Sequence, residues 1–219
     1  MEVKTFHVSN SFIKNQCYLI YSNHAGILVD PSWDYNLIKD FLVEQGIVLK
    51  GILLTHAHID HTDLAQRFAV YYDVQVFMSS TEIEDYGFHC WNLERVFHLQ
   101  ELFIDCFKII PILTPGHTSG SICYLIDRHL FSGDTVFIEG VGICNAEGSD
   151  VNKMFDSVQF LKSYLPEYTL FWPGHSFGQS PGKSLRFLLE NNIYLQIESR
   201  KIFTDFRMRK KQPDPFSFC

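Results

Sequence analysis

The sequence predicts a layered fold that mixes β-strands and α-helices (α/β or α+β class) within one domain. Short apolar runs of strand length recur along the chain. Helical patterns separate the later runs, so strands and helices alternate in that part of the chain. Apolar residues make up 46% of the 219 residues, which is enough to bury a sizeable core.

Eight runs have the length and composition of strands. They are rich in Ile, Val, Leu and Phe, and most of them end at Gly, Pro or a polar residue. The runs are CYLIY (17–21), GILVD (26–30), GILLT (51–55), VQVFM (74–78), KIIPILT (108–114), ICYLID (122–127), HLFSGD (129–134) and TLFWPG (169–174).

Three stretches place apolar residues at helical spacing. The first spans Ser32 to Gly46, with Ser32 as the N-cap and Gly46 as the residue after the helix. The second covers about 150–164. The third begins at Ser180 and Pro181, a favourable pair for the N-cap and the first helical position.

We expect one domain over residues 1–206, which includes a short C-terminal helical region over about 180–206. A basic tail over 207–219 follows, because the composition changes there. Such a tail is either solvated or a patch that binds an acidic group. Its basic residues are Arg207, Arg209, Lys210 and Lys211.

Charge and composition exclude several classes of protein. The formal net charge of −7 argues against nucleic acid as a partner. No apolar run approaches the roughly 18 residues that span a membrane, so we expect no membrane partner. The first residues lack the apolar core of a secretory signal, and the six cysteines form no C-x-x-C pair. We therefore expect a cytoplasmic protein with free thiols.

Histidine and aspartate gather at the ends of four predicted strands. The stretch THAHIDHTD (55–63) follows GILL directly, and three later strands are each followed by one such residue. Neutral imidazoles and carboxylates are the ligands that borderline divalent metals prefer. A lone histidine after a strand is more often a cap or a surface residue, but four strand ends together predict a site for two metal ions. The residues are His56, His58, Asp60, His61, His117, Asp134 and His175.

These motifs carry a family resemblance. T-H-x-H-x-D-H, P-G-H-T, S-G-D-T and P-G-H follow one another in this order, and the combination resembles the metallo-β-lactamase superfamily over about residues 5–200. The resemblance implies a four-layer αββα sandwich with the metals in a groove at one edge of the sheets. It also implies two Zn²⁺ ions per chain, with iron or manganese as alternatives.

The resemblance assigns the ligands one by one. It implies that His56, His58 and His117 bind one ion. Asp60, His61 and His175 then bind the other, and Asp134 bridges the two. Asp60 and Asp134 are the expected catalytic residues, Asp60 as an orienting ligand and Asp134 as the group that holds both ions.

Three longer blocks point to one branch of the superfamily. PGHTSGSICYLI, SGDTVFIEGVG and PGH…LRFLLENNIYLQI resemble the glyoxalase II-like thioester hydrolases. Glyoxalase II enzymes place a basic residue for a glutathione carboxylate at the position of Ile143, and an apolar side chain cannot pair with a carboxylate. The chain also ends too soon after its helical region for the full glutathione-binding domain. We therefore do not expect glutathione as the thiol.

A shorter subgroup fits better. SGDTVFIEGVGIC and PGHSFGQSPGKSL resemble the polyketide-biosynthesis zinc-dependent hydrolases, which implies cleavage of acyl thioesters on carrier-protein or pantetheine thiols. An acyl carrier protein is then the expected partner, and Lys183 and Arg186 are further candidates for contact with substrate. The alternatives are a glyoxalase II-type glutathione thioester hydrolase, a lactonase and an iron-dependent persulfide dioxygenase.

Overall fold

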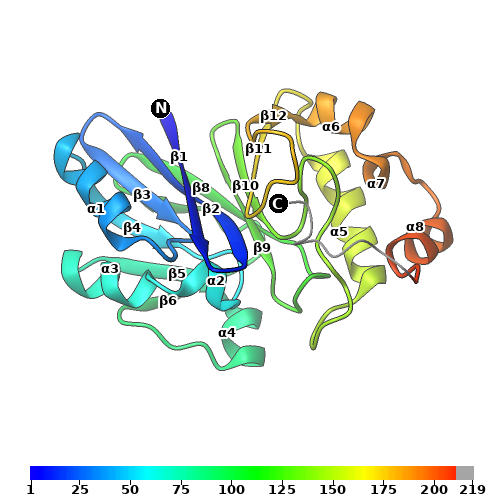
Figure 1. Cartoon of the computed structure of the whole chain (residues 1–219), viewed down its shortest axis with the longest axis horizontal. Coiled ribbons are helices and arrows are strands. Elements are labelled where there is room, and N and C mark those ends of the chain that lie inside the picture. Colours follow the sequence, from blue (N-terminus) through cyan, green and yellow to red (C-terminus); the bar gives the residue numbers. More distant parts are fainter. Residues whose placement is uncertain (211–219) are drawn as a thin grey trace.

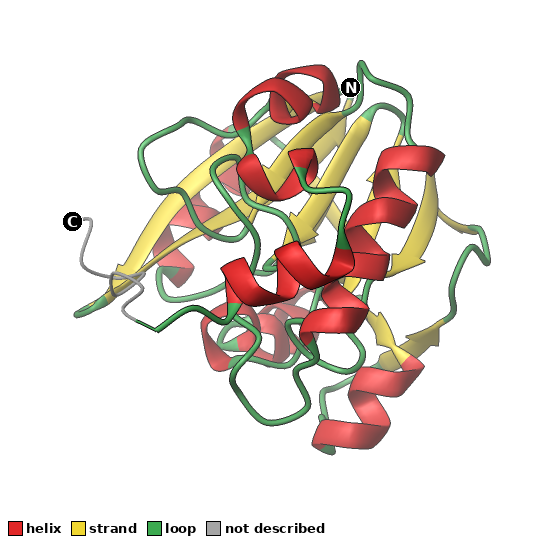
Figure 2. Cartoon of the chain, turned by 90° about the vertical axis from the view of Figure 1, so that its right-hand side faces the viewer, coloured by secondary structure: helices red, strands yellow, loops and turns green. Residues whose placement is uncertain are grey.

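Two six-stranded sheets pack face to face, and helices cover both outer faces, which gives the expected αββα sandwich (Figure 1). The structure, a computed structural model, describes residues 1–210. Figure 2 looks onto the second half of the chain, where helices lie across the outer face of its strands. Among residues 1–210, no helix combines the length and the apolar character that crossing a membrane requires.

The first sheet contains the first half of the chain in sequential order. Its strands are β1 (Glu2–Asn10), β2 (Ile13–Ser22), β3 (Ala25–Val29), β4 (Val48–Leu53), β5 (Gln75–Ser79) and β6 (Leu93–Val96). β1 to β3 are antiparallel, whereas β3 to β6 run parallel. The helices of this half are α1 (Tyr35–Glu44), α2 (Ile59–Thr62), α3 (Ala65–Tyr72) and α4 (Ser80–Tyr86).

The second sheet has the order β12-β11-β10-β9-β8-β7. Its strands are β7 (Leu102–Ile104), β8 (Phe107–Leu113), β9 (Ile122–Ile126), β10 (His129–Gly133), β11 (Leu170–Pro173) and β12 (Lys183–Ser184). All pairings are antiparallel except that of β10 with β11. The helices of this half are α5 (Val151–Tyr164), α6 (Leu185–Asn191), α7 (Ile193–Gln196) and α8 (Arg200–Arg207).

A continuous apolar layer fills the space between the sheets. Phe107, Phe131 and Tyr124 from the second sheet pack there with Tyr18 and Ile27 from the first. Each such side chain stabilises the fold by about 1.5–3 kcal/mol through burial. The two tyrosine hydroxyls also join the sheets.

The two hydroxyls reach strand ends of the opposite sheet. Tyr124 Oη donates to the carbonyl of Leu54, at 3.0 Å, and Tyr18 Oη donates to the carbonyl of Pro173, at 2.6 Å. Both carbonyls belong to chain segments that lead directly into histidines of the predicted metal site. The sheets are therefore fixed to each other at the edge where those histidines lie.

The predicted strands are confirmed, but two predicted helix starts are wrong. Asp34, not Ser32, caps α1, since its carboxylate accepts a hydrogen bond from Leu37 N at 3.0 Å. Ser32 is buried instead, with its hydroxyl 3.3 Å from Cys17 Sγ. Gly46 does follow the helix, with a φ of 60° that suits glycine.

The third predicted helix starts later than its sequence suggests. Gly182 N donates to the carbonyl of Phe171, and the next two residues pair with β11 as the short strand β12. Ser184 then caps α6 by accepting from Phe187 N. Pairing with a neighbouring strand thus overrides the local preference of Ser180 and Pro181 for a helix start. The helix predicted over 150–164 is confirmed as α5, with Asp150 as its N-cap.

The C-terminal boundary needs one correction. Arg207, expected in a solvated basic tail, is the last residue of α8 and is 6% exposed. Its Nε donates to the carbonyl of Gly142 at 2.8 Å. Arg209 and Lys210 follow the helix and are exposed. Lys211 and the rest of the predicted tail lie outside the described residues.

Candidate metal centre

The first four predicted ligands lie on one short segment after β4. Asp30, at the end of β3, receives hydrogen bonds from Thr55 N at 2.8 Å and Thr55 Oγ1 at 2.6 Å, which fix the start of this segment. His56 and His58 follow in a short irregular stretch, and His58, with an extended backbone, directly precedes α2. The short helix then turns His61 back toward His56, with ring centroids 4.1 Å apart.

The other three predicted ligands come from separate strand ends of the second sheet. His117 lies in the loop between β8 and β9, Asp134 directly follows β10, and His175 follows β11 by one residue. That one residue is Gly174, where a Cβ atom would lie 2.4 Å from His61 Cε1 and 2.6 Å from Asp134 Oδ1. Only glycine allows the backbone to approach the cluster this closely.

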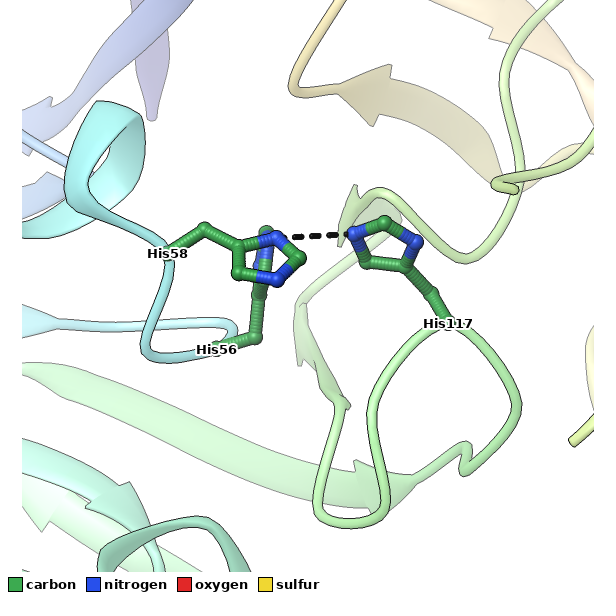
Figure 3. A group of neighbouring side chains, drawn as sticks. All are labelled: His56, His58 and His117. Atoms are coloured by element: carbon green, nitrogen blue, oxygen red, sulfur yellow. Dashed lines mark hydrogen bonds between the residues drawn. The ribbon is translucent and has the colours of Figure 1, made fainter. Parts of the chain in front are cut away.

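All seven predicted ligands meet at one place. His58 Nδ1 lies 3.0 Å from both His56 Nε2 and His117 Nε2. Figure 3 shows that His58 and His117 point toward each other from different loops. Asp60 Oδ2 lies 3.4 Å from His175 Nε2 and 3.6 Å from His61 Nε2. Each of these two triads keeps its ligand atoms within 4.8 Å of one another.

Asp134 lies between the two triads. Its Oδ2 is 3.6 Å from His117 Nε2 and 3.4 Å from His175 Nε2, and its Oδ1 is 3.4 Å from His61 Nε2. One carboxylate therefore approaches ligands of both groups. This is the position that a bridging ligand takes between two ions.

The spacing of these side chains suits binding to a divalent metal ion better than hydrogen bonding of the side chains to one another. His61 Nε2 and Asp134 Oδ1 are buried, and neither has a hydrogen-bond partner among the described residues. Leaving such groups unsatisfied is costly. Two ligands of one tetrahedral zinc lie roughly 3.4 Å apart, given metal–ligand distances near 2.1 Å. The spacing around Asp134 matches that value.

The protonation of the cluster also suits a metal. Burial lowers the pKa of His58 to about 4 and the pKa of His56 well below its usual value, so both imidazoles are neutral. Burial opposes ionisation of Asp134, but the charges of His175 and His61 outweigh it and hold the pKa of Asp134 well below its ordinary value. Neutral imidazoles and ionised carboxylates are the forms that bind metals.

His61 and His175 differ from the other histidines, because their pKa values are raised in the metal-free protein. Burial lowers the pKa of His175, yet Asp134 and Asp60 outweigh it and raise the pKa to about 10. The pKa of His61 is raised well above its usual value, because Asp134 and Asp30 outweigh burial. In the metal-free protein these two rings carry protons, which a metal would displace.

For His61, His117 and His175, an oxygen lies beside the outer ring nitrogen and fixes the ring. His61 Nδ1 lies 2.9 Å from Asp30 Oδ2, and His117 Nδ1 lies 2.9 Å from the carbonyl of Ile143. His175 Nδ1 is 2.7 Å from the carbonyl of Lys14. Such partners are the usual second half of a metal site, because they set the tautomer and orientation of each ligand.

Three residues that support the ligands, namely Asp30, Asn15 and Glu82, were not predicted from the sequence. Asp30 ends the GILVD strand, so the strand-end pattern that identified the ligands applies to it as well. Asn15 Nδ2 donates to Asp60 Oδ2 at 2.9 Å, and nothing in its sequence context indicates this. Glu82 binds the backbone of two ligand loops and carries no motif either.

A small cavity opens onto the cluster. It measures about 120 Å³, and apart from the ligands its lining is apolar. The ligands that line it are His58, Asp60, His117, Asp134 and His175, and the apolar residues are Ile13, Phe137, Ile143 and Phe177. This volume is well below the ~300 Å³ at which pockets for whole small-molecule ligands begin. The cavity therefore has room for only part of a molecule of that size.

Of the three residues predicted to contact substrate, only Ile143 lies at the cavity, whereas Lys183 and Arg186 lie elsewhere. Ile143 lines the cavity. Lys183 lies over the ring of Phe187, 5.3 Å from its centroid, and Arg186 Nε donates to Glu167 Oε2 at 2.8 Å. Neither basic residue lines the cavity.

Comparison with known families agrees with this geometry. The profile described as the metallo-beta-lactamase superfamily matches residues 12–175. The chain belongs to the metallo-β-lactamase superfamily. The matched region begins beside Ile13 and ends at His175, so it contains every ligand described above.

Relatives within the superfamily cover most of the chain. A protein of Bacillus velezensis, named "Probable polyketide biosynthesis zinc-dependent hydrolase BaeB", is 46% identical over 99% of this chain and 96% of its own length. A hydroxyacylglutathione hydrolase of Francisella philomiragia is 30% identical over 82% of this chain and 69% of its own length. The solved structure of ETHE1 from Myxococcus xanthus superimposes with a TM-score of 0.85 at 25% identity, covering 98% of this chain and 93% of that one.

Proposed function

We propose that this protein is a dinuclear zinc-dependent hydrolase that cleaves acyl thioesters carried on the pantetheine thiol of a carrier protein in polyketide biosynthesis. The observation that carries the proposal is the meeting of seven metal-binding side chains beside an apolar cavity. The names of two relatives, at 46% and 43% identity, support zinc, hydrolysis and polyketide biosynthesis.

Each of the seven candidate ligands has a role in binding the two zinc ions. His56, His58 and His117 would hold one zinc ion, Asp60, His61 and His175 would hold the other, and Asp134 lies close enough to both groups to serve both. Bound zinc supplies Lewis acidity for a carbonyl and lowers the pKa of water to about 7. Asn15 keeps the Asp60 carboxylate in place through its hydrogen bond.

A thioester suits the composition of the cavity. Every titratable residue that lines it is one of the proposed metal ligands, so no separate acid stands beside the substrate there. A thiolate leaves without prior protonation, because its conjugate acid has a pKa of about 8.5. An alkoxide leaving group, as in a lactone, needs more help.

The apolar lining favours pantetheine over glutathione. Ile143 offers no partner for a carboxylate, whereas glutathione carries two. The pantetheine arm is uncharged near its sulfur and leaves no buried charge unpaired beside Ile143 and Phe177. The carrier protein itself remains outside the small cavity. Such an enzyme is expected in the cytoplasm, which cell fractionation checks.

The test offers one acyl group on three thiols to the zinc-loaded protein. The substrates are the glutathione thioester, a pantetheine thioester and the acylated carrier protein. We expect kcat/KM for the two pantetheine-type substrates to exceed that for glutathione by about tenfold or more, since an unpaired buried charge costs at least 1–3 kcal/mol. His24→Ala is the matched control, because this exposed histidine lies outside the cluster.

Two results would contradict the proposal. A preference for glutathione would identify a glyoxalase II-type hydrolase. Inactivity on all three thioesters, together with turnover of a lactone or uptake of oxygen with a persulfide, would identify one of the other reactions of this site.

A further inference from the structure

Glu82 is a fully buried carboxylate that lies behind the metal cluster. It sits in the first turn of α4 and has no solvent exposure. Its Oε1 accepts a hydrogen bond from Ala57 N at 2.8 Å. Its Oε2 accepts from Thr118 Oγ1 at 2.8 Å and from Gly120 N at 3.0 Å.

These partners belong to the two loops that carry the three-histidine group. Ala57 stands between His56 and His58, on the segment that follows β4 of the first sheet. Thr118 follows His117 directly, on the loop between β8 and β9 of the second sheet. One carboxylate therefore joins two ligand loops that come from different sheets.

The position of Glu82 is itself fixed. Ser79 caps α4 by accepting from Glu82 N at 3.0 Å, and its hydroxyl donates to the carbonyl of Gly120 at 2.5 Å. A Cβ atom on Gly120 would lie 2.2 Å from Glu82 N, so only glycine allows this approach. The start of α4 is thus held firmly against the loop of His117.

Stability alone is a poor explanation for this carboxylate. A buried charge is expensive to desolvate, and an apolar side chain of similar volume stabilises a core at least as well. The carboxylate accepts three hydrogen bonds from two backbone segments and so fixes the distance between them, which an apolar residue cannot do. Among the described residues, its hydrogen bonds include none to Asp60, His61 or His175.

We propose that Glu82 is a positioning residue, which sets the distance between the loop of His56 and His58 and the loop of His117, and thereby the metal affinity of that triad. The inference rests on the proposed function in so far as the protein must bind zinc. It predicts an unequal effect, in which loss of Glu82 weakens the three-histidine group and leaves the group of Asp60, His61 and His175 nearly unchanged.

The test measures zinc affinity by competition with a chromophoric chelator. Two backgrounds separate the groups: Asp60→Ala with His175→Ala keeps the three-histidine group, and His58→Ala keeps the other. Glu82→Gln is introduced into each, because its amide NH2 would replace one carboxylate oxygen and would face either the N–H of Ala57 or the donors of Thr118 and Gly120. We expect a 10- to 100-fold loss of affinity in the first background, as for other partners that orient ligands, and less than about threefold in the second.

The control is Glu84→Gln, two residues along the same helix. Glu84 is exposed and pairs with Arg95, and its substitution should change neither affinity. Circular dichroism of each variant checks that the fold is retained. In case Glu82→Gln fails to fold, Thr118→Val removes one of the three donors at similar volume. We expect a loss of about 3- to 10-fold in the first background only, because two of the three hydrogen bonds to the carboxylate remain.

The outcomes separate the two proposals. Equal losses in both backgrounds, or no loss in either, would overturn the role of Glu82 and leave the zinc hydrolase intact. A wild-type chain that binds no zinc would overturn both. A loss confined to the three-histidine background supports the inference.

Discussion

The two sheets supply the seven candidate metal ligands in different ways. The first delivers His56, His58, Asp60 and His61 from a single segment after β4. The second delivers His117, Asp134 and His175 from three strand ends that are far apart in the sequence. One half of the site is thus a local motif, whereas the other half exists only once the strands of the second sheet lie side by side.

The halves also differ in what fixes them. Carboxylates support the first half, since Asp30 contacts His61 and one oxygen of Glu82 contacts the backbone beside His56; the other oxygen of Glu82 reaches the loop of His117. Backbone carbonyls support the second half, at Ile143 for His117 and at Lys14 for His175. A side-chain support can be removed by substitution, but a carbonyl support persists through any substitution that keeps the fold. The first half is therefore the more sensitive to mutation.

The largest expected effect comes from the residue that joins the halves. Asp134→Ala should lower kcat/KM by about 1,000-fold or more, because metal ions supply several kcal/mol of transition-state stabilisation. His58→Ala should act similarly. Zinc content by atomic absorption and far-ultraviolet circular dichroism accompany the kinetics, and both variants should keep the fold. A fully active Asp134→Ala protein would refute the dinuclear assignment.

A smaller effect should follow from removing a carboxylate support of the first half. Asp30→Asn replaces one acceptor beside His61 with an amide donor, and we expect zinc affinity at the group of Asp60, His61 and His175 to fall 10- to 100-fold. Asp40→Asn, at an exposed position of α1, is the control. An unchanged affinity would show that the first half needs no such support.

The second half offers the converse experiment. Ile143→Arg changes the side chain that faces the cavity, while its carbonyl beside His117 remains. Zinc content should therefore stay the same, and activity on glutathione thioesters relative to pantetheine thioesters should rise about 10-fold, since hydrogen bonds to charged groups contribute about 1.5–3 kcal/mol. Ile143→Leu is the matched control. A loss of zinc in Ile143→Arg would contradict the carbonyl support.

The smallest effect is expected outside the cavity. Arg186 forms an exposed ion pair with Glu167, and such pairs are worth about 0–1 kcal/mol. Arg186→Ala and Lys183→Ala should each change kcat/KM on the acylated carrier protein by less than about twofold, since neither residue lines the cavity. A tenfold decrease in either variant would instead assign that residue to contact with the carrier.

Strand ends explain why the sequence predicts the ligands well. His117, Asp134 and His175 each come directly after a glycine that follows an apolar run. This pattern can be recognised from neighbouring residues alone. The role of Glu82 is not local, because its partners lie on two loops that meet only after the sheets pack. The helix start at Ser180 was wrong for a related reason, since pairing with β11 outweighs a favourable cap.

The division of each ligand group between the two sheets has a consequence for the life of the protein in the cell. His58 and His117 would bind one ion from opposite sheets, and His61 and His175 would do the same for the other. Zinc would then act as a cross-link of the sandwich, which adds about 2.7 kcal/mol of stability when its free concentration is 100 times Kd. A cell short of zinc would lose this enzyme to proteolysis as well as to inactivity, so its abundance should follow the metal supply.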